Sequence, residues 1–396
     1  SEEKEIQTII KHWIRTLNIK FGWINDFDKF VAKYATNFFI FEEFYLSSKL
    51  LNTLTKHIDV VWSIDYSTFN DNQFICSGSK DNTIRVWDIN ANKQIKLYTG
   101  HPDYVYCVKF SPYHHYTNRR SVICSSSNDE TINFWDFKHN KQLQIFNGHT
   151  RGVCCIEFSS FNGGKYLCSG SYDKTIRLWD IETSKSLHIF NGHTDIVRCL
   201  DISPLQNNNN NNNNNNIGII GGNGYTICSG SFDKTIQISD IETTKQLILF
   251  KGHTDWIRSV KYGSNKLTNI ILSGSEDKSV RLWDIRSCQQ IQSFNRHTYT
   301  VNAIEYSPFI VNNIEIGGSS NVICSGSWDN TIRFWDIRSN RNELYIMKGE
   351  NNDDGIVCFK FLQLKKKEKK IKGNNNLGCD IKLCYGSLSG LICIWG

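Results

Sequence analysis

The chain has 396 residues, 39% of them hydrophobic, and a formal net charge of +6. The run Lys365–Lys372 holds six Lys and one Glu, hence +5, so the remainder carries about +1. This distribution argues against a broad basic surface for nucleic acid. The sequence also has no apolar run typical of a signal peptide or a membrane span. We therefore expect no nucleic-acid partner and no membrane association.

Residues 1–45 have a helical pattern. One amphipathic helix is predicted by Ile6, Ile9, Ile10, Trp13, Ile14 and Leu17. A second is predicted after Gly22 by Ile24, Phe27, Phe30, Val31, Tyr34 and Phe38. We assign residues 1–45 to a short α-helical extension that either packs on the side of the following domain or offers a helix to a partner. Because the chain begins at Ser1 and not at Met, we treat it as a fragment that an upstream domain could precede.

From residue 46 to residue 396, one unit recurs seven times. Its clearest copies are CSGSKDNTIRVWDI, CSGSYDKTIRLWDI and CSGSWDNTIRFWDI, at Cys76–Ile89, Cys168–Ile181 and Cys324–Ile337. In six copies an Asp stands six residues before the aromatic position of the Trp-Asp step. The next His follows that position by 14 residues, five times in succession. A unit of this size cannot bury both of its faces alone and must stack on its neighbours.

These repeats resemble the WD-repeat (G-beta-like repeat) β-propeller family, whose units carry Gly-His and Trp-Asp over four strands. The resemblance predicts an all-β fold, a seven-bladed propeller. In the third unit, we predict strands at Val153–Ser159, Tyr166–Ser171, Thr175–Asp180 and Ser186–Asn191. Insertions fall in the first hairpin of their units. They include an Asn-rich loop at about 206–222, expected to be disordered, and a Lys-rich loop at about 362–378.

The two ends of the repeat region predict how the ring closes. The seventh unit stops at Trp395-Gly396 without a fourth strand. The segment LLNTLTKH at Leu50–His57 aligns with the fourth strand and His of the other units, yet no unit precedes it. We predict that Leu50–Thr55 pairs with the seventh blade, because closure removes an open sheet edge.

Six units carry His, Ser and Asp in register, and five of these also carry the Trp. One unit alone could be taken for a hydrolase triad, but an active site needs no six copies. The resemblance implies that these side chains form a hydrogen-bonded chain inside each blade, which satisfies buried polar groups. This predicted structural network comprises His57, Ser77, Asp81, Trp87, His101, Ser125, Asp129, Trp135, His149, Ser169, Asp173, Trp179, His193, Ser229, Asp233, His253, Ser273, Asp277, Trp283, His297, Ser325, Asp329 and Trp335.

Two units depart from the pattern. The fourth has Ser239 in place of Trp and so lacks the indole donor. The seventh has Glu350, Tyr385 and Ser389 where the others have His, Ser and Asp. We expect the seventh blade to be the least stable.

Most of the 14 cysteines recur at equivalent positions of different blades, too far apart to form disulfides. No Cys-x-x-Cys or Cys/His spacing typical of a metal site is present. We interpret them as small buried residues of an intracellular protein. We predict no catalytic residue, no cofactor and no metal, and hence no enzyme. The location is expected to be cytoplasmic, and also nuclear if Lys365–Lys372 acts as an import signal.

The resemblance implies that ligands dock where the loop after each His meets the turn before each Asp. Aromatic and arginine side chains, which dominate interface energetics, are frequent at these positions. The alternative for any one of them is packing on a neighbouring loop. The predicted partner-binding residues are Trp62, Tyr104, Tyr106, Tyr172, Arg198, Phe232, Trp256, Arg258 and Trp328. We predict a non-catalytic scaffold that binds a peptide or loop of a protein partner within a multi-subunit assembly.

Two other functions remain open at this stage. The motif WD-x-Arg at 283–286 and 335–338 resembles the adaptor-docking motif of cullin-type ubiquitin ligase substrate receptors. The propeller could also be the sensor of a larger switch protein. A propeller fold by itself does not choose among these functions.

Overall fold

The computed structural model describes residues 44, 48–69, 72–203, 225–263, 267–307, 322–337, 343–363 and 381–396. The predicted N-terminal helices, the Asn-rich loop and the Lys365–Lys372 run therefore lie outside the described residues. None of the helices that the structure describes is long and apolar enough to cross a membrane.

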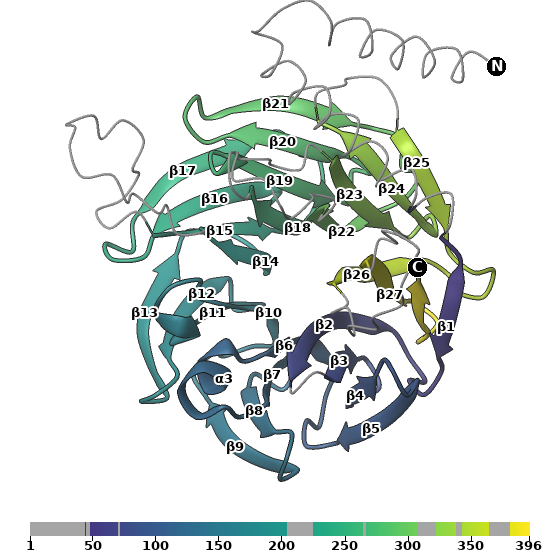
Figure 1. The fold of residues 1–396 in the computed structure, drawn as a ribbon. Coiled ribbons are helices and arrows are strands. Elements are labelled where there is room, and N and C mark those ends of the chain that lie inside the picture. The colour runs from purple at the N-terminus through teal and green to yellow at the C-terminus, as the bar shows by residue number, and fades with distance from the viewer. Residues whose placement is uncertain are drawn as a thin grey trace, which may run out of the picture.

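Seven antiparallel sheets of four strands surround a central axis (Figure 1), which confirms the predicted seven-bladed propeller. The first three blades follow the chain in order. Their strands are β2 (Val61–Phe69), β3 (Asn72–Ser79), β4 (Ile84–Asp88) and β5 (Lys93–Tyr98); β6 (Val105–Phe110), β7 (Val122–Ser127), β8 (Ile132–Asp136) and β9 (Lys141–Phe146); and β10 (Val153–Phe158), β11 (Tyr166–Ser171), β12 (Thr175–Asp180) and β13 (Lys185–Asn191). Helix α3 (Pro112–Asn118) and the short 3-10 helix η1 (Asn162–Gly164) lie in the first hairpins of blades 2 and 3.

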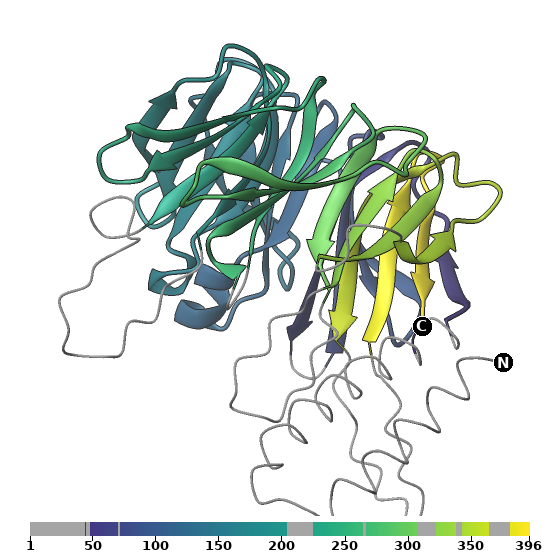
Figure 2. The ribbon, with the colours of Figure 1, turned by 90° about the horizontal axis from the view of Figure 1, so that it is seen from above.

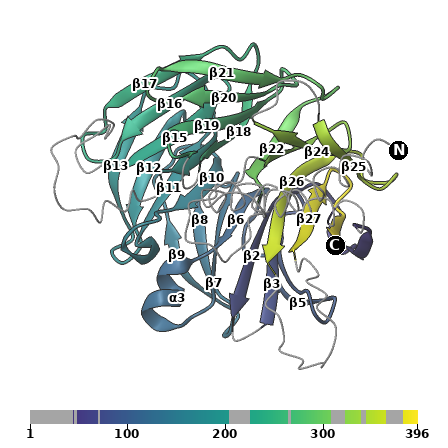
Figure 3. The same cartoon turned by 45° about the horizontal axis from the view of Figure 1, so that its top comes forward.

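Blades 4 to 7 repeat this arrangement. Their strands are β14 (Val197–Ile202), β15 (Thr226–Ser231), β16 (Thr235–Asp240) and β17 (Gln246–Lys251); β18 (Ile257–Tyr262), β19 (Ile270–Ser275), β20 (Val280–Asp284) and β21 (Gln289–Phe294); β22 (Val301–Tyr306), β23 (Val322–Ser327), β24 (Thr331–Asp336) and β25 (Glu343–Lys348); and β26 (Ile356–Gln363), β27 (Ile381–Ser387), β28 (Ile392–Trp395) and β1 (Leu50–Leu54). In each of the seven blades, the first strand lies nearest the central axis (Figure 1 and Figure 3).

The ring closes through the N-terminal strand, as predicted. Strand β1 pairs antiparallel with β28, with Leu50 opposite Trp395 and Leu54 opposite Ile392. Backbone bonds between Lys49 and Gly396 extend the pairing at both the N–H and the carbonyl. Figure 2 shows β1, in purple, beside the yellow C-terminal strands.

The core lies between the blades, because each sheet packs both faces against a neighbour and is apolar on both. Phe44 belongs to the core between blades 6 and 7, where it is 3% exposed and its ring lies 6.2 Å from that of Phe334. From the sequence we expected this residue in the N-terminal extension, residues 1–45.

The pairing of the first two strands contains the same irregularity in every blade. In blade 3 the register shifts between Val153 and Cys155, so Cys154 is an extra residue on β10. Such a β-bulge redirects a side chain out of the regular alternation. The equivalent extra residues are Trp62, Tyr106, Cys154, Arg198, Arg258, Asn302 and Val357, which we call the bulge ring.

Candidate functional site

A hydrogen-bonded chain of side chains recurs in blades 1 to 6. In blade 3, His149 lies 2.7 Å from Ser169 through Nε2 and 2.8 Å from Asp173 through Nδ1, and Trp179 Nε1 donates to Ser169 Oγ at 2.8 Å. The other five blades repeat the two His contacts at 2.6 to 2.8 Å. Four of them repeat the indole contact at 2.8 or 2.9 Å, whereas blade 4 has Ser239 there.

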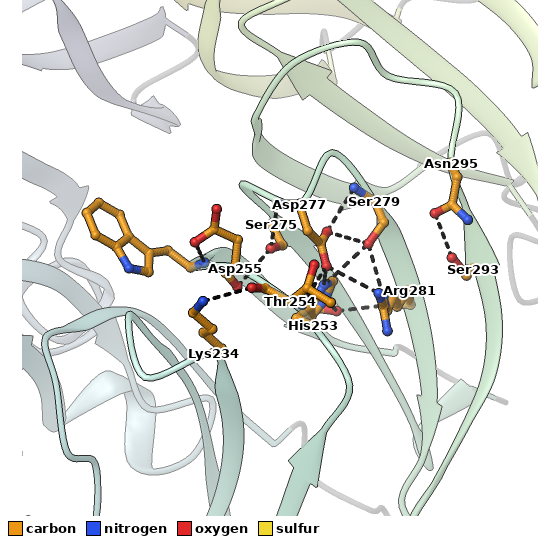
Figure 4. Close-up of polar contacts among 12 residues, drawn as sticks. Lys234, His253, Thr254, Asp255, Ser275, Asp277, Ser279, Arg281, Ser293 and Asn295 are labelled. Atoms are coloured by element: carbon orange, nitrogen blue, oxygen red, sulfur yellow. Dashed lines mark hydrogen bonds and ion pairs between the residues drawn. The ribbon is translucent and has the colours of Figure 1, made fainter.

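The Asp of each hydrogen-bonded group also stabilises the turn in which it lies. Thr175 donates to Asp173 Oδ1 from its backbone N at 2.9 Å and from Oγ1 at 2.7 Å. Figure 4 shows the equivalent group in blade 5, where Ser279 takes the place of Thr beside His253 and Asp277. This hydroxyl residue is not among the network residues predicted above, although it recurs two positions after the Asp in all six units.

The protonation states follow from burial and hydrogen bonding. Burial raises the pKa of the Asp173 carboxyl, but hydrogen bonds from His149 and Thr175 outweigh it and leave that pKa below its usual range. The same balance lowers the pKa of Asp233 and Asp329 to about 2. Burial lowers the pKa of His149, as it does in blades 1 and 5. A neutral ring then donates from Nδ1 to the carboxylate and accepts the Ser hydroxyl proton at Nε2.

This group has the composition of a hydrolase triad but not its accessibility. Ser169 is fully buried, and its oxygen already accepts a hydrogen bond from the Trp179 indole. A substrate atom cannot reach an oxygen enclosed in this way. The arrangement ties strands, loop and turn of one blade together, and it offers no open position for chemistry.

In blade 7, other residues form the equivalent buried hydrogen-bonded group. Tyr385, at the Ser position, donates from its hydroxyl to Asp353 Oδ2 at 2.6 Å, and the backbone N of Glu350 donates to the same oxygen at 2.6 Å. Asp353 is 0% exposed. The carboxyl group thus comes from neither Glu350 nor Ser389, the positions aligned with His and Asp. Sequence alignment gave no signal for Asp353, because it lies in the loop between the two aligned positions.

The loop after each His and the turn before each Asp meet on one side of the ring. In blade 3, the backbone N of Tyr172 donates to the carbonyl of Gly152 at 2.9 Å, and the equivalent bond is present in all of blades 1 to 6. The turn and the loop are therefore held together, and their side chains emerge side by side. We call this side of the propeller the aromatic face.

The nine predicted partner-binding residues gather on the aromatic face in two groups. Tyr106 is central to the first: its ring lies 6.0 Å from Trp62, 6.5 Å from Tyr104 and 5.8 Å from Tyr172. The Arg198 guanidinium lies over the rings of Trp62 and Tyr106, at 5.6 and 5.9 Å. Tyr106 is almost buried and its hydroxyl lies 3.2 Å from that of Tyr172, so this residue does pack on its neighbours.

The second group surrounds Arg258. Its guanidinium lies 5.1 to 5.7 Å from the ring centres of Phe232, Trp256 and Trp328. Arg258 also forms an ion pair with Glu276. Burial and the nearby charge of Arg198 lower the pKa of Arg258. Trp256 is 37% exposed and presents one of the large open aromatic surfaces of this face.

Below the bulge ring, the first strands contribute one charged residue each, eight positions after the His in blades 1 to 6. These residues are Asp65, Lys109, Glu157, Asp201, Lys261, Glu305 and Lys360. Lys109 pairs with Glu157 at 2.7 Å, Lys261 with Asp201 at 3.7 Å and Lys360 with Glu305 at 3.1 Å. These charged residues are not among the site residues predicted above, although their spacing from the His is regular in blades 1 to 6.

A cavity of about 160 Å³ opens at the centre, lined by all seven residues of the bulge ring and by most of the charged residues below them. Among the residues that the structure describes, no group of His, Cys, Asp and Glu is placed to hold a metal ion. Burial raises the pKa of the Cys154 thiol to about 12, so this cavity residue is a poor nucleophile at neutral pH.

Comparison with known proteins adds to this geometry. The repeat profile described as WD domain, G-beta repeat matches residues 48–88, 92–136, 140–180, 184–240, 244–284 and 288–336. WD repeat and SOCS box-containing protein 1 of Danio rerio is 36% identical over 67 residues, 17% of this chain and 16% of that protein. The Peroxisomal targeting signal 2 receptor of Homo sapiens is 32% identical over 63 residues, 16% of this chain and 20% of that protein. Guanine nucleotide-binding protein subunit beta of Zea mays is 44% identical over 57 residues, 14% of this chain and 15% of that protein. The chain thus matches at most a fifth of the length of these relatives.

Proposed function

Because this chain belongs to the family of WD domain, G-beta repeats, whose propellers generally bind other proteins without catalysis, we propose that it is a non-catalytic scaffold. Its partner is a peptide segment or loop of another protein, and it acts within a multi-subunit intracellular assembly. Nucleic acid is not its ligand on this proposal, since little net charge remains outside Lys365–Lys372.

The gathering of nine aromatic and arginine side chains from different blades on one face is the observation that carries this proposal. Two of them, Tyr104 and Trp256, are among the exposed large hydrophobic residues. Large rigid rings lose little conformational entropy on binding and bury much area, so clusters of them are typical of binding hot spots. The recess at the centre favours a protruding segment over a flat surface.

Affinity capture from cell extract, followed by mass spectrometry, tests this function. The bait is the full chain, compared with the double variant Trp256→Ala/Trp328→Ala and with a variant carrying alanines throughout Lys365–Lys372. The proposal predicts that the main partner is lost with the aromatic variant and kept with the lysine variant. Loss only with the lysine variant would instead indicate an anionic partner of that run.

The exposed position of Arg286 favours a second candidate function, that of a substrate receptor of a cullin-type ubiquitin ligase. Arg286 of the first WD-x-Arg motif is exposed, and the Asn269 amide oxygen, when turned toward it, accepts from its guanidinium at 2.9 and 3.1 Å. Arg338 of the second motif lies outside the described residues. Ligase adaptor and cullin peptides in the captured material, absent with Arg286→Ala, would support this candidate.

A further inference from the structure

The cavity at the centre of the aromatic face has an uneven balance of charges. Its lining includes five cations, Lys109, Arg198, Arg258, Lys261 and Lys360, and two carboxylates, Glu157 and Glu305. Four of the cations have a carboxylate within 4.0 Å, either from the lining or from Asp201 and Glu276 beside it. Within the described part of the chain, Arg198 has none.

The guanidinium of Arg198 is held in place, but few of its N–H donors have a hydrogen-bond acceptor among the described residues. Trp62 and Tyr106 support its guanidinium, and among the described residues its one hydrogen-bond acceptor is the carbonyl of Cys154, at 3.3 Å. A guanidinium has five N–H donors in a fixed planar array that matches a carboxylate. Most donors of this half-buried group therefore have no acceptor among the described residues.

Buried donors without partners also occur beside both arginines. The indole Nε1 of Trp62, which lines the cavity under Arg198, is buried and has no hydrogen-bond partner in the part of the chain that the structure describes. The indole Nε1 of Trp328, whose ring lies next to Arg258, is also buried and also lacks a hydrogen-bond partner among the described residues. A buried N–H left unpaired destabilises the structure, because the group has lost its hydrogen bonds to water without gaining others. A ligand that accepts hydrogen bonds would relieve this destabilisation.

The bulge in each first strand explains why these groups converge. Trp62, Arg198 and Arg258 are bulge-ring residues of different blades, so each is turned from its own strand toward the same opening. The bulge ring contains no acidic residue. The cavity of about 160 Å³ is smaller than the roughly 300–1,000 Å³ that small-molecule sites usually need, and it suits one side chain.

We propose that the bulge ring binds the carboxylate of one acidic side chain of the partner segment, with Arg198 as the charged donor and the Trp62 indole as a second donor. This inference rests on the proposed function and deepens it, since it gives the chemistry of the central contact. The aromatic side chains around the opening contact the rest of the segment.

Three short peptides and the intact chain provide the test. The probes are acetyl-Gly-Ala-Glu-Ala-Gly-amide, the same peptide with Gln in place of Glu, and acetyl-Gly-Ala-Ala-Ala-Gly with a free C-terminus. Indole N–H resonances, assigned with Trp62→Phe, report binding at the site. The Trp87 indole, which donates to Ser77 at 2.9 Å, is the internal reference.

The Glu peptide should shift the Trp62 indole resonance and leave that of Trp87 in place. The Gln peptide should bind at least about tenfold more weakly, a difference of about 1.4 kcal/mol. Arg198→Met should abolish the response, whereas Arg151→Met, a change at an exposed arginine in the blade 3 loop of the same face, should preserve it.

Equal responses to the Glu and Gln peptides, or an unchanged response in folded Arg198→Met, would overturn the inference. A response to the peptide with the free C-terminus alone would also overturn it, because the ligand would then be a terminal carboxylate and not a side-chain one. No response to any probe would also reject it. If Trp256→Ala/Trp328→Ala loses the captured partner while Arg198→Met keeps it, the scaffold function stands and the carboxylate contact does not.

Discussion

Phe232 and Trp256 stack face to face, with ring centres 4.0 Å apart and planes 7° apart, although they belong to neighbouring blades. Phe232 precedes Asp233 in blade 4, and Trp256 follows His253 in blade 5. The hydrogen bonds of two different blades therefore position one aromatic pair, and Arg258 lies over both rings. A surface organised before binding loses less entropy when a partner docks.

Trp256→Ala should weaken binding of the captured partner by more than about 1 kcal/mol, because it removes an exposed aromatic ring from the face. Stability should fall by at most about 1 kcal/mol, the value of one aromatic pair. Calorimetric titration and thermal melting measure the two effects. Tyr116→Ala, at a 72% exposed tyrosine in α3, is the matched control and should leave binding intact. Equal binding by the two variants would reject the aromatic face.

Asp173→Ala should destabilise the propeller by about 1–3 kcal/mol, because it leaves the donors of His149 and Thr175 without their acceptor. Urea unfolding measures this change. Glu182→Ala removes an exposed carboxylate of the same blade and should change stability by no more than about 0.5 kcal/mol. An unchanged urea midpoint for Asp173→Ala would show that the network does not support the fold.

Stability should decrease as the pH falls below neutral. Burial makes the folded-state pKa of His57, His149 and His253 lower than the usual 6.5, so the unfolded chain binds more protons below that pH. This contribution is present above pH 6.5 and is lost as the pH falls through the lowered values. The Asp carboxyls of the network cause a second loss of stability below pH 3.8, which extends to the lowered pKa of about 2 for Asp233 and Asp329.

Urea midpoints measured at about pH 7.5, 5.5 and 3.5 should therefore fall at each step. His149→Gln removes one of the titrating groups and should make the decrease between the first two values smaller. A midpoint that rises on acidification to about pH 5.5 would contradict the assignment of neutral, buried rings.

Tyr385→Phe should destabilise the closing blade by about 1–3 kcal/mol, because it removes a donor from the fully buried Asp353. Tyr98→Phe is the control, since its hydroxyl donates to a backbone carbonyl at the longer distance of 3.3 Å. The Tyr385 variant should show the larger decrease in urea midpoint. The opposite order would mean that the Asp353 contact contributes little.

Deletion of residues 1–43 should leave a folded, monodisperse propeller, whereas deletion of residues 1–56 should cause aggregation. The longer deletion removes β1, exposes the edge of β28 and takes away the buried Leu54. The shorter one keeps Phe44 in its core position. Size-exclusion chromatography compares the two, and equal monodispersity would reject the role of β1 in closure.

The fold could be predicted from the sequence because the same unit, with the same spacing of its key residues, recurs seven times. The strands expected in blade 3 differ from the observed ones by at most one residue at either end. The candidate surface could be predicted as a set of positions, since register places Tyr104 and Trp256 at the same position of equivalent loops, three residues after the His. The buried position of Phe44 could not, because its contacts come from blades 6 and 7, far along the chain.

By itself, the sequence determined the number of blades, the residues of the network and the closing strand, because each depends on local spacing that recurs in register. Only the tertiary structure decided which side chains meet. The bulge that turns Arg198 toward Trp62, the pairing of charges below it and the Tyr385–Asp353 contact all join residues from separate strands or loops. Such contacts depend on how a closed ring places neighbouring blades, and no spacing along one unit encodes that distance.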